Sequence, residues 1–118
     1  MGFVFDSGGL SIYHAGDTIP YDGLAGRLRE LSVDVALLPI NGRDARREAL
    51  DIVGNLDADE AAALAVEAGV DVVVPMHYDM FAANLGDPAA LVSTVERAGS
   101  NVTVVVPARG RPFVYTRP

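Results

Sequence analysis

The apolar runs of this chain are short, and segments with helical spacing separate them. Val33–Pro39 and Asp71–Met76 are almost entirely apolar, which is typical of parallel strands buried on both faces. Between them, Asp57 and Glu60 have capping-box spacing, directly ahead of the helix-forming stretch Ala61–Ala68. Strands that alternate with helices in this way predict an α/β architecture with parallel strand pairs.

The remaining segments extend this pattern. Two more helices are expected, one from the leucine spacing of Asp22–Leu31 and one between Asp87-Pro88 and Gly99. The other expected strands are Gly2–Phe5 and Leu10–His14, which form a hairpin, and then Val102–Val106 and Pro112–Tyr115. We therefore predict a single domain over residues 1–118, with a mixed sheet and its helices on one face. The length fits one domain.

Charge and composition exclude several classes of protein. The formal net charge of −7 over 118 residues argues against a nucleic-acid partner, because such partners usually meet a basic face. No cysteine is present, which excludes disulfides and thiolate metal sites. The sequence has no apolar stretch near 18 residues and no signal-peptide pattern at Met1–Phe5, so we expect no membrane contact and a cytoplasmic location.

Two metal-capable side chains follow expected strands. Asp17 comes after the run that ends at His14, and Gly16 allows a tight turn before it. His77 follows Asp71–Met76, at a strand end where ligands commonly bind in open α/β sheets. Spacing alone leaves other interpretations open, namely a helix-capping aspartate and a structural histidine. His14 is expected to pack or hydrogen-bond within its strand.

Further polar residues near strand ends are candidates for substrate binding. Asn41 and Arg43 follow Val33–Pro39, and Arg43 could hold a phosphate or carboxylate through two parallel hydrogen bonds. A solvated loop arginine is the alternative. Tyr78 adjoins His77 and completes the expected substrate-binding set. Asp79 could orient a metal-bound histidine or form a loop salt bridge.

Four stretches in chain order carry a resemblance to a known family. They are Ile12–Thr18, Val35–Gly42, Gly54–Asp57 with Glu60-Ala61, and Val74–Phe81. Together they resemble the lactonase branch of the metallo-β-lactamase superfamily, in particular metal-dependent hydrolases like L-ascorbate-6-phosphate lactonase. The resemblance implies an αββα sandwich of two similar halves, of which this chain resembles the C-terminal half.

The resemblance also implies a site and a reaction. Asp17 and His77 would bind a divalent metal, zinc or manganese, which lowers the pKa of water to roughly 7 and polarises the substrate. The family's His-x-His-x-Asp-His cluster is not in this sequence, which has only two histidines. We therefore expect an incomplete hydrolase of lactone or phosphoester substrates, with weak or absent metal binding in this chain alone.

Two expectations about partners follow. A half-sandwich would expose a sheet face, so we expect either a homodimer packed through that face or a missing N-terminal half, absent because the chain is a fragment, has a misassigned start or is one subunit of a split enzyme. The alternative function is a non-catalytic binding or assembly domain that keeps the half-fold.

Overall fold

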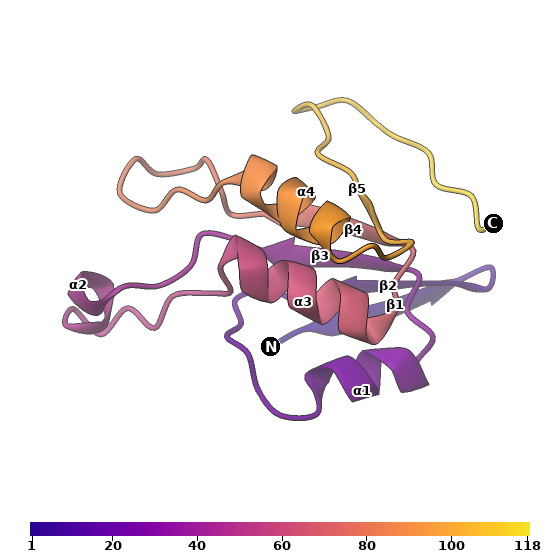
Figure 1. The fold of residues 1–118 in the computed structure, drawn as a ribbon, viewed down its shortest axis with the longest axis horizontal. Helices are drawn as coiled ribbons and strands as arrows, with labels where there is room; N and C mark the ends of the chain where they lie inside the picture. Colours follow the sequence, from indigo (N-terminus) through magenta and orange to yellow (C-terminus); the bar gives the residue numbers. More distant parts are fainter.

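A five-stranded mixed sheet organises the computed structural model, which describes all residues from Met1 to Pro118. The strands lie in chain order, with β1 antiparallel to β2 and every later neighbour parallel. Figure 1 shows this sheet as the central layer. Its strands are β1 (Phe3–Ser7), β2 (Leu10–His14), β3 (Val35–Pro39), β4 (Val72–Met76) and β5 (Thr103–Val104).

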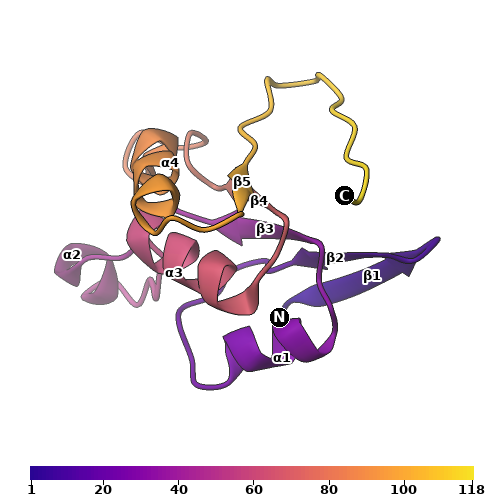
Figure 2. The same cartoon turned by 45° about the vertical axis from the view of Figure 1, so that its right-hand side comes forward.

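Three helices cover one face of the sheet, and a fourth lies beyond its edge (Figures 1 and 2). The covering helices are α1 (Leu24–Glu30), α3 (Ala58–Ala68) and α4 (Pro88–Arg97). The short α2 (Ala45–Glu48) lies in the excursion between β3 and α3. The predicted α/β class, mixed sheet and one-sided helices are confirmed. No helix is long and apolar enough to span a membrane.

Local chemistry sets the helix ends. Asp57 accepts from the Glu60 backbone N–H at 2.8 Å while the Glu60 carboxylate accepts from the Asp57 N–H at 3.0 Å, which is the predicted capping box. Asp87 caps α4, and Pro88 occupies its first turn as expected. These caps satisfy N–H groups that would otherwise lack partners.

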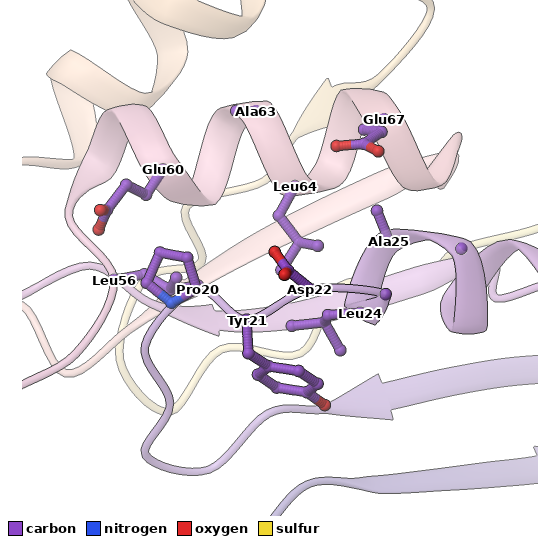
Figure 3. Close-up of a pocket in the computed structure, with 12 residues that line it drawn as sticks. Pro20, Tyr21, Asp22, Leu24, Ala25, Leu56, Glu60, Ala63, Leu64 and Glu67 are labelled. Atoms are coloured by element: carbon purple, nitrogen blue, oxygen red, sulfur yellow. The ribbon is translucent and has the colours of Figure 1, made fainter.

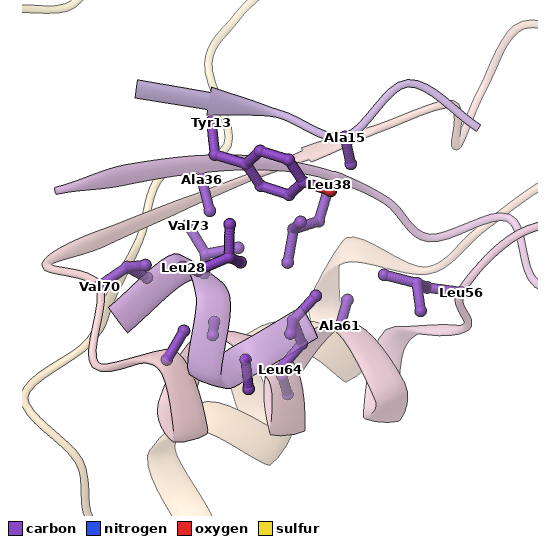
Figure 4. Close-up of a cluster of buried hydrophobic side chains, with 14 of the residues drawn as sticks. Tyr13, Ala15, Leu28, Ala36, Leu38, Leu56, Ala61, Leu64, Val70 and Val73 are labelled. Atoms are coloured by element: carbon purple, nitrogen blue, oxygen red, sulfur yellow. The ribbon is translucent and has the colours of Figure 1, made fainter. Parts of the chain in front are cut away.

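The main core lies between the sheet and the helices (Figure 4). Leu38 and Val73 come from adjacent strands, and Ala61 faces them from α3; all three are fully buried. Leu28 brings α1 into the same cluster. Burial of a large aliphatic side chain contributes roughly 1.5–3 kcal/mol, so this layer fixes the sheet that carries the site.

The C-terminal segment covers part of the opposite face and does not form the strand predicted at Pro112–Tyr115. Tyr115 packs against the small cluster of Val35, Val72 and Val74, and its hydroxyl donates to Asp71. Pro112 has no N–H for a ladder, and side-chain bonds anchor the segment instead. The predicted strand Val102–Val106 shortens to Thr103–Val104 for a related reason, because Pro107 ends the pairing.

Candidate functional site

The ends of three adjacent parallel strands bring the candidate residues together. Asp17 follows β2, Asn41 follows β3 and His77 follows β4 directly. Because β2, β3 and β4 are parallel neighbours, their carboxyl ends share one edge of the sheet. Segments far apart in the sequence therefore meet at this edge.

A glycine turn presents Asp17. The Ala15 N–H donates to the Leu37 carbonyl at 3.0 Å and extends the β2–β3 pairing by one residue. Gly16 then turns the chain at a φ of 63°, and a Cβ there would lie 2.8 Å from the Met1 carbonyl oxygen. Its N–H donates to His14 Nδ1 at 3.1 Å, so His14 has the expected role of a hydrogen-bonding strand residue.

His77 adopts a left-handed backbone conformation. Its φ is 57°, a region that non-glycine residues seldom occupy, although histidine, asparagine and aspartate do so more often than the others. Such a conformation costs on the order of 1–3 kcal/mol and persists where the surroundings impose it. The Ile40 N–H donates to the Met76 carbonyl at 3.1 Å, which holds the chain just before this turn.

The two predicted metal ligands converge. Asp17 Oδ1 lies 3.2 Å from His77 Nδ1, and the Asp17 side chain is 79% exposed while that of His77 is 36% exposed. Two ligand atoms held ~2.0–2.1 Å from one ion at a tetrahedral angle lie about 3.3 Å apart. The spacing and donor types of this pair therefore fit two ligands of one divalent ion.

The pair does not complete a metal site within the chain. No group of three or more histidine, cysteine, aspartate or glutamate side chains is arranged to hold an ion. Structural zinc sites use four ligands and catalytic ones usually three from protein. The metal role of Asp17 and His77 stays a prediction.

Behind the pair, three amide side chains form a linked network. Asn55 Nδ2 donates to Asp17 Oδ1 at 3.2 Å and to Asn41 Oδ1 at 3.0 Å. Asn55 Oδ1 accepts from the Thr18 backbone N–H at 2.8 Å, and Asn41 Nδ2 donates to Asn84 Oδ1 at 2.8 Å. Asn41 and Asn55 are buried, so their hydrogen bonds fix the loops against one another.

Arg43 lies in a structural ion pair. Its two terminal nitrogens donate to the Glu60 carboxylate at 2.7 and 2.6 Å, and Nη1 also donates to the Asn55 carbonyl at 3.1 Å. This bidentate contact lowers the pKa of Glu60 and raises that of Arg43. The guanidinium is thus occupied within the chain, which does not favour the expected role in substrate binding.

Of the remaining candidate residues, two have structural contacts and one lines the site. Tyr78 packs against the main core, and its carbonyl accepts from the Gly86 N–H at 2.9 Å. Asp79 pairs with Arg109, which is the loop salt bridge. Asn41, in contrast, lines an open hollow of about 270 Å³ together with Asp17 and His77.

Sequence reasoning missed two residues of this hollow. Asn55 stands between a glycine and the Asp57 cap, and Asn84 lies in the loop between β4 and α4. Each is a lone asparagine in a loop, a pattern that also suits ordinary turns. They differ from ordinary turn residues only in the structure, where both form hydrogen bonds with Asn41.

Comparison with known proteins places this arrangement in a family. A model of the beta-lactamase superfamily domain matches residues 1–78, which carry β1 to β4 and both candidate ligands. The chain belongs to the beta-lactamase superfamily. The matching stretches that suggested this likeness lie mostly within the matched range.

The chain is similar to several proteins described as UPF0173 metal-dependent hydrolases. One from Myxococcus xanthus is 34% identical over 111 residues, covering 93% of this chain and 36% of the relative. One from Korarchaeum cryptofilum is 34% identical over 116 residues, covering 96% of this chain and 46% of the relative. The chain thus spans less than half the length of these curated relatives.

Solved structures show the same fold. Igni18, described as a novel metallo hydrolase from Ignicoccus hospitalis, superposes with a TM-score of 0.72 at 31% identity, covering 98% of this chain and 46% of that one. YhfI from Bacillus subtilis, a metallo-beta-lactamase fold protein, gives a TM-score of 0.62 at 16% identity and supports the fold alone. In that comparison 89% of this chain and 41% of that one are covered.

Proposed function

We propose that this chain contributes Asp17 and His77 to the divalent-metal centre of a metal-dependent hydrolase. The observation that carries the proposal is the 3.2 Å approach of Asp17 Oδ1 to His77 Nδ1 at the carboxyl edge of the parallel strands. Relatives described as metal-dependent hydrolases support the reaction class. Bound there, an ion would supply Lewis acidity toward a carbonyl or phosphoryl oxygen and activate water.

The residues of the chain then have separate roles. Asp17 and His77 hold the ion, and the Asn55 amide orients the Asp17 carboxylate from its buried side. Asn41 braces Asn55, and Met80 and Phe81 form the apolar part of the hollow. A lactone or a phosphoester is the expected substrate, because both present an oxygen that such an ion polarises.

Completion of this centre requires further ligands from another polypeptide segment. We propose a second copy of the chain or a missing N-terminal half as the source, in line with the exposed part of the sheet face that lies opposite the helices. On that face Phe3 and Phe5 are 54% and 56% exposed. The same exposed surface favours the alternative function, an assembly domain without catalysis.

The two histidines allow a direct test by nuclear magnetic resonance. Titration with Zn²⁺ is expected to shift the His77 imidazole signals and leave those of His14 unchanged, and Mn²⁺ is expected to broaden the same His77 signals. Asp17→Asn should weaken the effect, whereas Asp22→Asn, a substitution in an exposed loop, should not. His77 signals that stay unchanged at millimolar metal would contradict the proposal.

Activity gives a second measurement. Any hydrolysis of lactone or phosphoester substrates should depend on added metal, disappear with a chelator and disappear in Asp17→Asn. Metal binding at His77 without hydrolysis under any condition of assembly would support the assembly function instead.

A further inference from the structure

The loops beside the Asp17–His77 pair carry large apolar side chains in solvent. Leu50 is 66% exposed and Ile52 47% exposed in the segment after α2, and Phe81 is 62% exposed in the loop after β4. Figure 1 shows both segments projecting from the same end of the sheet. Large apolar side chains gathered at one exposed place commonly mark a binding surface.

These side chains line a hollow that adjoins the proposed metal site. The hollow has a volume of about 340 Å³, and its walls include Leu50, Ile52 and Phe81. It shares Phe81 and Asn84 with the hollow that holds Asp17 and His77. A ligand could therefore occupy both hollows at once.

One cation in this hollow is free. Arg47 donates to Asp44 at 2.7 Å, and that pairing neutralises the only carboxylate in the walls. Arg43 is tied to Glu60. Arg46 also lines the hollow, and its guanidinium has no hydrogen-bond or ion-pair partner in the chain. Arg46 therefore gives the hollow one uncompensated positive charge, in a chain whose net charge is −7.

We propose that this hollow binds the non-reacting part of the substrate, and that this part is an apolar group carrying an anion. The inference rests on the proposed function, because it uses the same site. Leu50, Ile52 and Phe81 contact the apolar group, and Arg46 pairs with a phosphate or carboxylate. The substrate class is thus an amphipathic, anionic ester or phosphoester.

The groove between α1 and α3 offers a useful contrast (Figure 3). Its volume is similar, about 300 Å³, and Leu24 and Leu64 give it an apolar floor. Its charged side chains are the carboxylates of Asp22, Glu60 and Glu67, and it shares no wall residue with the Asp17–His77 hollow. That groove does not suit an anion. It therefore serves as a control for nonspecific binding of the anionic probes elsewhere on the protein.

The test uses metal-free protein, so that it stands apart from metal binding. Phenyl phosphate and hexanoate are titrated separately, because each combines an apolar group with an anion. Inorganic phosphate, which has only the anion, and phenol, which has only the apolar group, are the comparison probes. Phenyl phosphate or hexanoate should shift the resonances of Leu50, Ile52 and Phe81 at lower concentration than phosphate or phenol does. The order of the two anions identifies the preferred head group.

Matched variants locate the binding. Arg46→Gln should weaken binding of phenyl phosphate by about fivefold, as expected for an exposed charge pair. Arg111→Gln, another exposed arginine without a side-chain partner, should leave binding unchanged. Leu50→Ser should weaken the binding of hexanoate more than the binding of inorganic phosphate.

Four results would overturn the proposal. Three of them are equal binding of phosphate and phenyl phosphate, unchanged affinity in Arg46→Gln, and shifts confined to the α1–α3 groove. A change in sedimentation of Leu50→Ser without a change in ligand affinity would also overturn it, by showing a protein interface. None of these results bears on metal binding by His77, which is measured separately.

Discussion

Asn55 Nδ2 donates to Asp17 Oδ1 at 3.2 Å, so a buried amide orients an exposed carboxylate. The same Nδ2 group donates its other N–H to Asn41, and Asn55 Oδ1 accepts from the Thr18 backbone. Three of the four hydrogen bonds that the Asn55 side chain can make are thus formed, including both from its N–H donors. The carboxylate of the site is held by a side chain that itself has little freedom.

Asn55→Ala is expected to destabilise the chain by about 1–3 kcal/mol, because it leaves the buried Asn41 amide short of a partner. Urea denaturation measures the change. The control is Asn101→Ala at an exposed position, which should stay within about 0.5 kcal/mol of the unsubstituted chain. If the two variants lose the same stability, Asn55 has no special role in the network.

The left-handed backbone of His77 leads to a second prediction. His77→Gly should be more stable than His77→Ala by about 1 kcal/mol, since only glycine relieves a φ of 57° without steric cost. Both variants lack the imidazole, so the difference isolates the backbone. The difference in stability is measured from the urea denaturation midpoints of the two variants, provided that the dependence of the unfolding free energy on urea concentration is the same for both.

The matched control for His77 is two residues further on. Asp79 has no positive φ, so Asp79→Gly should be no more stable than Asp79→Ala. Equal stabilities of the two His77 variants would show that the turn carries no strain.

The edge of the sheet that carries the site could be predicted from the sequence. Apolar runs such as Val72–Met76 fix the strands, and parallel pairing then places Asp17 and His77 at one edge. Short, nearly continuous apolar runs leave few alternatives to buried parallel strands. The capping box at Asp57 is equally local and was predicted for that reason.

Contacts between distant segments could not be predicted in this way. Arg43 lies at a strand end, as a ligand-binding arginine would, yet Glu60 on α3 takes its guanidinium. The segment around Tyr115 has strand-like composition, yet its side-chain bond to Asp71 draws it across the sheet. No sequence pattern identifies Glu60 or Asp71 as the partner, because each contact depends on how the helices and the C-terminal segment pack on the sheet.

The pair formed by Asp34 and Arg117 predicts a pH dependence of stability. Arg117 Nε donates to the buried Asp34 carboxylate at 2.8 Å, and this bonding lowers the pKa of Asp34 below its ordinary value of 3.8. A lowered carboxyl pKa contributes stability that is full above 3.8 and is lost as the pH falls through the folded-state value.

Arg117→Gln should therefore lower the free energy of unfolding at pH 7, and this loss should shrink below pH 3.8, where Asp34 becomes protonated. Denaturation curves at several pH values check this. Arg111→Gln, which removes an unpaired arginine, should show a small effect that does not depend on pH. A loss that stays constant through the acid range would contradict the role of Asp34.

The sheet face opposite the helices gives the last prediction. Phe5 pairs in register with Ile12, and Ile12 pairs with Val35, so all three lie on this face. The C-terminal segment covers Val35 through Tyr115, but Phe3 and Phe5 stay more than half exposed, with ring centroids 6.3 Å apart. β1 also has a free edge, since it pairs only with β2.

We therefore expect a two-fold homodimer that buries the β1 side of this face. Sedimentation velocity over a range of concentrations should show reversible dimerisation, and Phe3→Ser with Phe5→Ser should shift the equilibrium to monomer. Leu31→Ser, on the helical side and 37% exposed, is the control and should dimerise normally. A chain that stays monomeric at high concentration would reject the self-association. A missing N-terminal half would then be the proposed source of the further metal ligands.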